Sequence, residues 1–210
     1  MMSRTPILHF THESNLVTIF DRGCLLCDRL RRLSGTNARS IAYDSIKQKR
    51  SQTTVEVSPG GTLDDYVPFY FGPCSPMMLT YKSGNVTGQE ESLDEIVYFV
   101  SEAEKVAYQG IPFVFTDGHP IVEPRFFSND LDDLDEVDLA LMREKWWFDT
   151  DEYPDRKRRR QAEFLVWERL PLELVSYLVT RTEDKREQVE QLLLSKGRKI
   201  PCRMYRSWYY

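Results

Sequence analysis

The sequence predicts an α+β fold in one domain that spans residues 1–210. About six to eight short segments are rich in β-branched and aromatic residues, and the few helical patterns between them do not alternate strictly with these segments. The sequence contains neither a G-x-G-x-x-G loop nor a Walker A loop, which excludes the usual doubly wound nucleotide-binding sheets. No Gly/Ser- or Pro-rich linker divides the chain, so one compact domain with its own core is expected.

The N-terminal part is expected to hold two strands separated by a helix and a polar loop. Ile7–His12 is apolar and β-prone, which predicts a strand. Ser14 is suited to cap a helix that ends at Gly23. Gly35–Thr54 is basic and only weakly periodic, so a long loop or short helical pieces are expected there. The aromatic run Leu63–Phe71 predicts a second strand.

The rest of the chain is expected to add four strands and two helices. The strands are predicted for the short apolar segments Glu95–Ser101, Pro112–Thr116, Ala162–Trp167 and Val175–Thr180. Leu131–Trp146 has a helical pattern, and a further helix is expected between the cap Thr182 and Gly197. The tail Ile200–Tyr210 is expected to close the sheet.

Charge is unevenly distributed along this chain of net charge −5. Basic residues gather in Asp28–Arg50, Asp155–Arg160 and Lys196–Arg206, whereas Asn129–Glu152 is strongly acidic. One basic run is usually only a solvated face, but three in an acidic protein indicate a track for a polyanion such as nucleic acid.

The sequence predicts a cytoplasmic protein without a membrane segment or a metal site. No apolar run approaches the roughly 20 residues of a membrane helix, and the start has no signal-peptide pattern. Cys24 and Cys27 form a C-x-x-C pair, but Cys74 and Cys202 stand alone and only three histidines occur. A zinc site would need two further soft ligands, so free thiols near a helix end are the better interpretation.

Five segments, in this order, resemble the DarT family of toxins. They are Thr11–Leu16 (T-H-x-x-N-L), Ile46–Arg50, Gly60–Phe71 with Ser75–Met77, Val114–His119 and Gln161–Glu163. The resemblance implies an ADP-ribosyltransferase-like fold with a central, mostly antiparallel, split β-sheet and flanking helices. It also implies an activity, the transfer of ADP-ribose from NAD⁺ to a thymidine base in single-stranded DNA with release of nicotinamide. A monomeric toxin with a DarG-like macrodomain antitoxin as its partner is expected.

Glu163 and Arg50 are the catalytic residues that the resemblance implies. A carboxylate is suited to stabilise the oxocarbenium character that develops on the ribose as nicotinamide leaves. A permanent guanidinium charge is suited to favour the anionic form of the base, whose N3 proton must be removed. The sequence leaves open which of the two assists that removal. Without the resemblance, Glu163 reads equally well as a surface residue and Arg50 as the end of a basic run.

The resemblance and the residues themselves together assign the cofactor and DNA contacts: the histidines, Asn15 and Arg50 follow from the resemblance, the tyrosines from alternation and stacking, and the DNA residues from the basic runs. NAD⁺ is expected to contact His12, Asn15, Arg50, Tyr66, Tyr70 and His119. DNA is expected to contact Lys47, Lys49, Arg156, Lys157 and Arg159. Alternation along the strand places Tyr70 opposite to Phe69 and Phe71, which are expected in the core. Cys74 stands where many relatives have an arginine, which predicts weakened or altered DNA contact.

Two other functions are compatible with these residues. His12, His119 and Glu163 could act as acid and base on a phosphodiester in a nuclease-like toxin. Alternatively, the basic runs could serve a nucleic-acid-binding domain without enzymatic activity, which would release no nicotinamide.

Overall fold

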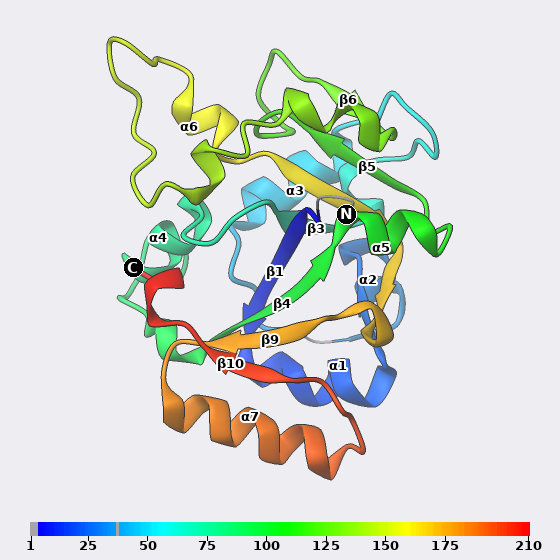
Figure 1. Cartoon of the computed structure of the whole chain (residues 1–210), viewed down its shortest axis with the longest axis vertical. Coiled ribbons are helices and arrows are strands. Elements are labelled where there is room, and N and C mark those ends of the chain that lie inside the picture. The colour runs from blue at the N-terminus through cyan, green and yellow to red at the C-terminus, as the bar shows by residue number, and fades with distance from the viewer. Residues whose placement is uncertain (1–3, 37) are drawn as a thin grey trace.

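An eight-stranded mixed sheet forms the centre of the molecule, in the order β10-β9-β4-β1-β3-β7-β5-β6 (Figure 1). The computed structural model describes residues 4–36 and 38–210, so the expectation for the first residues lies partly outside the described residues. The strands are β1 (Pro6–His12), β3 (Tyr66–Tyr70), β4 (Ile96–Glu102), β5 (Phe113–Thr116), β6 (Phe127–Ser128), β7 (Glu163–Trp167), β9 (Tyr177–Thr180) and β10 (Cys202–Met204). Neighbours are antiparallel except β9 and β10, which are parallel. The predicted α+β class is confirmed.

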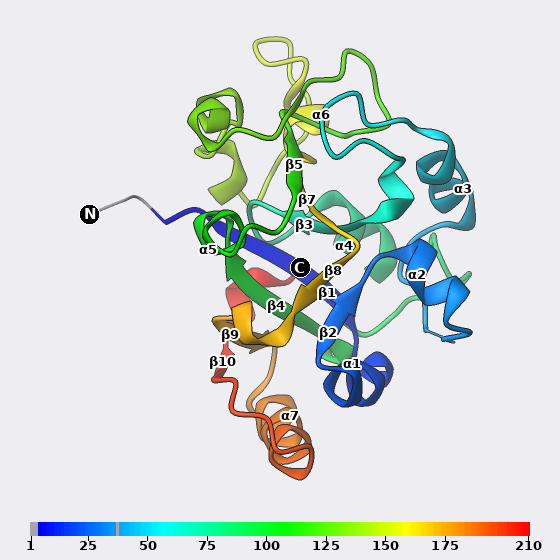
Figure 2. The same ribbon diagram turned by 90° about the vertical axis from the view of Figure 1, so that its right-hand side faces the viewer.

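The sheet is split into two halves between β1 and β3. β1 pairs with β4 along its whole length, from Pro6–Glu102 to His12–Ile96, but it meets β3 at the register pair Leu8–Tyr70. Figure 2 shows β3, β5 and β7 above β1, β4 and β9, with the two halves diverging from this junction. A separate two-stranded sheet pairs β2 (Cys24–Leu26) with β8 (Arg169–Pro171).

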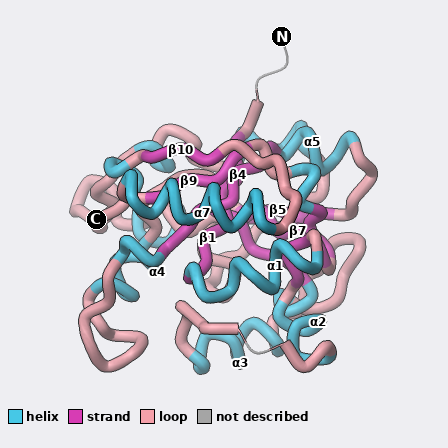
Figure 3. The backbone as a smooth tube through the Cα atoms, turned by 90° about the horizontal axis from the view of Figure 1, so that it is seen from below, coloured by secondary structure: helices cyan, strands magenta, loops and turns pink. Residues whose placement is uncertain are grey.

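Helices cover the sheet and its edges. They are α1 (Leu16–Arg22), α2 (Asp28–Leu33), α3 (Asp44–Gln52), α4 (Pro76–Lys82), α5 (Ala103–Tyr108), α6 (Arg156–Arg159) and α7 (Glu183–Ser195). Seen from below, α1 and α7 lie side by side against the strands (Figure 3). Phe20 of α1 and Leu193 of α7 belong to the same core cluster as Phe99 of β4, so this packing is apolar.

Alternation along β3 separates a core face from a second face, as predicted. Val67 and Phe69 are fully buried in the largest core cluster, together with Phe71 just beyond the strand. Tyr66 and Tyr70 point to the opposite side and belong to other clusters. Because successive side chains of a strand face opposite ways, one five-residue element serves the core and the second face at once.

The helix predicted for Leu131–Trp146 is not present. The segment forms two short 3₁₀ turns, Leu131–Glu136 and Leu141–Arg143. Six acids crowd Asp130–Asp138, where like charges at helical spacing repel. The Asp130 and Asp138 carboxylates instead accept hydrogen bonds from the backbone N–H groups of Asp132 and Leu141 at 3.1 and 2.9 Å, which favours turns over a helix.

Other departures are local. The first residues of the predicted strand Leu63–Phe71 form a 3₁₀ turn, Leu63–Asp65. The polar stretch Gly35–Thr54 contains a short helix, α3, as one of the two expected outcomes. Helix α4 was missed, although Ser75 caps it and Pro76 occupies its first turn. The tail closes the sheet as expected, because β10 adds a parallel edge strand and Tyr209 is buried in the core.

The four cysteines are free thiols. Cys27 lies at the start of α2, where its sulfur accepts the Leu30 N–H at 3.4 Å. Among residues 4–36 and 38–210, no three His, Cys, Asp or Glu side chains are grouped to hold a metal ion. In the same residues, every helix is too short or too polar to cross a bilayer.

Replacing Phe69 by alanine should lower the free energy of unfolding by about 3–5 kcal/mol, because a fully buried ring is removed from the core. Tyr108→Ala is the matched control, since 89% of that ring is exposed, and it should change stability by less than about 0.5 kcal/mol. Urea unfolding of both variants checks this. Equal effects would show that Phe69 does not face the core.

Candidate active site

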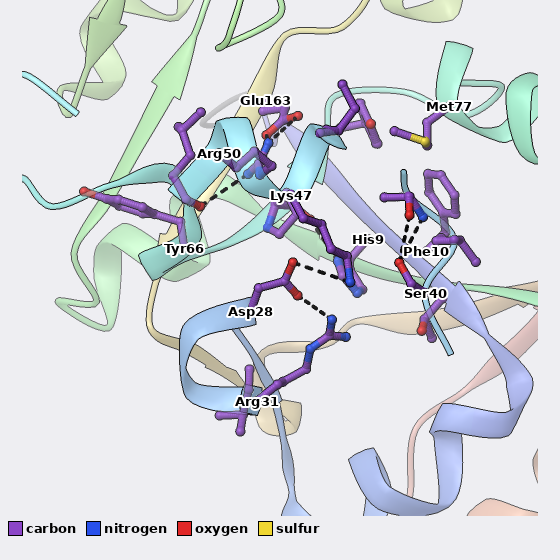
Figure 4. Close-up of a pocket in the computed structure, with 18 of the residues that line it drawn as sticks. His9, Phe10, Asp28, Arg31, Ser40, Lys47, Arg50, Tyr66, Met77 and Glu163 are labelled. Atoms are coloured by element: carbon purple, nitrogen blue, oxygen red, sulfur yellow. Dashed lines mark hydrogen bonds and ion pairs between the residues drawn. The ribbon is translucent and has the colours of Figure 1, made fainter. Parts of the chain in front are cut away.

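A cavity that is partly open to solvent lies where the two halves of the sheet diverge. Its walls come from β1, the start of α2, the segment before α3, α3 itself, β3 and the first residue of β7. Figure 4 shows Arg50 and Glu163 at one end and Asp28 and Arg31 at the other. An elongated cleft with charged groups at both ends suits a ligand that carries charge, such as a nucleotide.

Arg50 and Glu163 form an ion pair inside this cavity. Arg50 Nη1 donates to both carboxylate oxygens, at 3.1 and 2.8 Å, and both side chains are almost fully buried. Arg50 extends from the last turn of α3, whereas Glu163 is the first residue of β7 and its N–H donates to Thr116 Oγ1 at 3.0 Å. Two residues predicted from separate motifs therefore converge.

The charge of Arg50 is strongly stabilised. Burial works against the guanidinium, but the adjacent Glu163 carboxylate outweighs burial and raises the pKa of Arg50. The pair therefore lets a carboxylate stay in an enclosed site without leaving a buried charge unpaired.

Tyr66 and Tyr70 line the same cavity on the outer face of β3. The Tyr66 hydroxyl donates to the Gly60 carbonyl at 2.6 Å, which holds the ring against the Gly60-Gly61 turn. Tyr70 stacks on Phe10 with centroids 5.8 Å apart and lies opposite Glu163 in the sheet register. Burial raises the pKa of both hydroxyls, so they stay neutral. Both tyrosines expected to contact NAD⁺ therefore line the cavity, and the contact itself stays a prediction.

His119 also lines the cavity. Its backbone N–H donates to the Arg158 carbonyl at 2.9 Å, which joins the cavity edge to α6. Burial lowers the pKa of this imidazole. Its Nδ1 accepts the Ile121 N–H at 3.4 Å, so the neutral ring leaves its Nε2–H as a donor for a ligand.

His12 and Asn15 do not line this cavity. His12 Nδ1 accepts from the Ser14 N–H at 3.0 Å, and its Nε2 lies 2.9 Å from the Glu95 carboxylate. Asn15 binds the backbone of Arg39 through both ends of its amide, at 2.9 and 3.0 Å. Asn15 thereby fixes the segment Arg39–Ala42, which forms one wall of the cavity. Direct contact of either residue with a cofactor stays a prediction.

The residues predicted to bind DNA divide between two helices. On α3, Lys47 lines the cavity and Lys49 is exposed. On α6, Lys157 is exposed, Arg156 Nη2 donates to the Trp146 carbonyl at 3.2 Å, and Arg159 lies 3.5 Å from Asp138. Their neighbour Arg160 is fully buried and bonds backbone carbonyls of Pro73, Cys74 and Glu144, so it is structural.

Sequence reasoning missed several cavity residues, of which His9 is the most informative. His9 Nδ1 donates to the Pro68 carbonyl at 2.8 Å, because a carbonyl only accepts. Burial lowers the pKa of His9 to about 4, so the ring is neutral near pH 7 and its Nε2 is an acceptor. Asp28, Arg31 and Arg39 were also missed. Alternation along β1, which puts His9 and His12 on opposite faces, was the available signal.

Comparison with known proteins identifies similar chains. The family model described as "ssDNA thymidine ADP-ribosyltransferase, DarT" matches residues 8–210. The DNA ADP-ribosyl transferase of Thermus sp. (strain 2.9) is 36% identical over 208 residues, which cover 98% of this chain and 96% of the relative.

Two solved structures are similar along nearly the whole chain. Thermus sp. 2.9 DarT in complex with ADP-ribosylated ssDNA has a TM-score of 0.90 and 35% identity, covering 98% of this chain and 96% of the other. The same protein in complex with NAD⁺ has a TM-score of 0.86 and 33% identity, covering 98% of each chain.

His9 predicts a specific pH dependence of stability. The unfolded chain takes up the His9 proton near pH 6.5, but the folded chain takes it up near pH 4. Lowering the pH between these values therefore favours unfolding, with a cost on the order of 3 kcal/mol at pH 4 and no cost above pH 6.5. His9→Gln keeps a donor for Pro68 but does not titrate there. Denaturant unfolding from pH 7.5 to 4 should show the steeper loss in the parent chain, and parallel curves would contradict it.

Proposed function

Because this chain belongs to the DarT family of ssDNA thymidine ADP-ribosyltransferases, we propose that it transfers ADP-ribose from NAD⁺ to a thymidine base of single-stranded DNA, with Glu163 and Arg50 as its catalytic pair. The observation that carries the assignment of this pair is their ion pair inside the cavity, at 2.8 Å. Nicotinamide is the leaving group.

Binding of NAD⁺ is assigned to the residues that surround this pair. Tyr66 and Tyr70 supply flat, neutral rings against which nicotinamide can stack. His119 offers hydrogen bonds to the cofactor or the DNA, and Arg50 offers its guanidinium. His12 and Asn15 are retained as cofactor residues from the family resemblance, and Asn15 is also supported by its hold on the cavity wall.

Glu163 acts on the sugar. Its carboxylate faces the positive charge that develops on the ribose carbon as the bond to nicotinamide breaks. Arg50 holds that carboxylate in one position with two hydrogen bonds, so the charge is already oriented before the reaction begins. The new bond forms between the ribose carbon and N3 of thymine, and the N3 proton is released.

The ion pair supports Glu163, rather than Arg50, as the group that removes the N3 proton from thymine. A guanidinium must first lose a proton to act as a base, and the raised pKa of Arg50 opposes this. Glu163 can accept the proton in its ionised form. Arg50 then favours the anionic base through its charge.

DNA is assigned to the rim of the cavity. Lys47 and Lys49 on α3 and Arg156, Lys157 and Arg159 on α6 offer cations to the phosphates. Lys157 forms no ion pair with any residue that the structure describes, whereas Arg159 is partly engaged by Asp138. A base within a duplex could not enter this enclosed site, which supports a single strand as substrate.

The biological setting is proposed from family membership alone. We place the chain in the cytoplasm as a monomeric toxin, opposed by a DarG-like macrodomain antitoxin that removes the modification.

The nuclease alternative is less well supported by the geometry. It needs His12, His119 and Glu163 in one site, but His12 is bonded to Glu95 outside the cavity that holds the other two. A binding domain without activity does not account for a buried acid in a ligand-sized cavity.

Glu163→Gln should abolish transfer and leave oligonucleotide binding within a few-fold, because the amide oxygen can still accept from Arg50 and hold α3, whereas the charge that stabilises the transition state is removed. Tyr108→Ala, on the exposed surface, is the control. Mass analysis of a single-stranded oligonucleotide incubated with NAD⁺ measures the outcome. An added ADP-ribose on an intact strand supports transfer, shortened strands support the nuclease, and neither product with unchanged NAD⁺ supports a binder. Lost binding with retained activity would refute the role of Glu163.

Base choice is tested with four single-stranded oligonucleotides, each lacking one of the four bases. Only the strand without thymidine should remain unmodified when each is incubated with the protein and NAD⁺. The identity of the unmodified strand is read by mass. Modification of the thymidine-free strand would reassign the acceptor base.

A further inference from the structure

Two exposed aromatic rings stand together in the segment that leads into α6. The side chain of Trp146 is 61% exposed and that of Phe148 is 52% exposed, and their rings are nearly parallel with centroids 6.1 Å apart. Trp147 between them is buried and donates Nε1–H to the Tyr210 hydroxyl at 2.6 Å, which anchors the segment. Isolated exposed apolar residues are ordinary, but a stacked pair on an anchored backbone is typical of a binding surface.

Cations flank this aromatic pair. Arg156 Nη2 donates to the Trp146 carbonyl at 3.2 Å. Lys145 Nζ lies 5.8 Å from the centre of the Tyr210 ring, which itself lies 6.4 Å from the Trp146 ring. The segment between Phe148 and α6 is also rich in acidic residues.

Two of these acids already have partners in the fold. The Asp149 carboxylate accepts the Lys157 N–H at 2.8 Å, and Asp155 pairs with Arg158 at 2.8 Å. Engaged carboxylates repel an approaching phosphate less than free ones would.

The aromatic pair is connected to the cavity by two chains of contacts. Through α6, the Arg158 carbonyl accepts the N–H of the cavity residue His119 at 2.9 Å. Through the C-terminus, the Tyr210 hydroxyl donates to the Cys74 carbonyl at 2.6 Å, and the chain then leads from Cys74 into α4, whose Met77 lines the cavity. In Figure 1, α6, α4 and the C-terminus lie on the same side of the molecule.

We propose that Trp146 and Phe148 form a stacking platform for a base that flanks the target thymidine, with Lys145 and Arg156 beside the neighbouring phosphates. The proposal rests on the proposed function in that it takes single-stranded DNA as the ligand. Exposed aromatic faces next to cations are how single strands are held without base-specific hydrogen bonds.

The experiment compares a Trp146→Ala/Phe148→Ala double variant with Tyr108→Ala, which removes an exposed ring elsewhere. Three oligonucleotides share the same target thymidine: a short one, one extended on the 5′ side and one extended on the 3′ side. The double variant should raise KM about tenfold for one extended oligonucleotide, because one base loses its stacking partner. Its kcat, and all values for the short oligonucleotide, should match the parent chain. Trp146→Phe keeps an aromatic ring at this position, so its KM for the same extended oligonucleotide should lie much closer to that of the parent chain.

Binding of the same oligonucleotides without NAD⁺, followed by fluorescence anisotropy, should show the same pattern in Kd. Unchanged KM and Kd for both extended oligonucleotides would overturn the proposal that Trp146 and Phe148 stack on a base. Loss of binding to a protein, with DNA binding unchanged, would likewise overturn it. Equal losses for short and extended strands would also overturn it, because the effect would then lie in the cavity. Failure of the proposed function is distinct, since the parent chain would then bind strands but modify none.

Discussion

The ion pair between Arg50 and Glu163 is the interaction on which the rest of the site depends. It joins residues 113 positions apart and ties α3 to the first residue of β7. Helix α3 has no buried residue of its own, so it is not held over the cavity by an apolar face. The guanidinium, which we propose as a catalytic group, is therefore also the anchor of one cavity wall. Loss of either partner would leave the other charge buried and unpaired.

Periodicity predicted the elements that repeat a simple pattern. Six strands of the sheet were found because their apolar residues form short, β-prone runs, whereas the two-residue strand β6 was not predicted. Alternation placed Phe69 in the core and Tyr70 toward the cavity. The helix expected at Leu131–Trp146 failed because apolar spacing was weighed without the local charge. In that segment, carboxylates bind backbone N–H groups and hold turns.

The site was only partly accessible from sequence. The resemblance pointed to Arg50, Glu163 and His119, and alternation pointed to Tyr66 and Tyr70; the structure brings all five to one cavity. On β1 the resemblance assigned His12, whereas the histidine of this strand that lines the cavity is His9, on the opposite face. Asp28 and Arg31 belong to a short helix whose place beside the cavity depends on long-range packing. Such placement has no signal in local spacing.

The narrow junction between the two halves of the sheet affects how the cleft can adapt. β1 pairs with β4 along its whole length, but it meets β3 at the register pair Leu8–Tyr70. Backbone pairing therefore does little to fix the distance between the two halves of the sheet. The width of the cleft is therefore set by side chains such as those of Phe10 and Tyr70, which stack across this seam. Substitution of a few such side chains could reshape the pocket for another nucleobase, while the backbone pairing of β1 with β4 and of β3 with β7 stays intact.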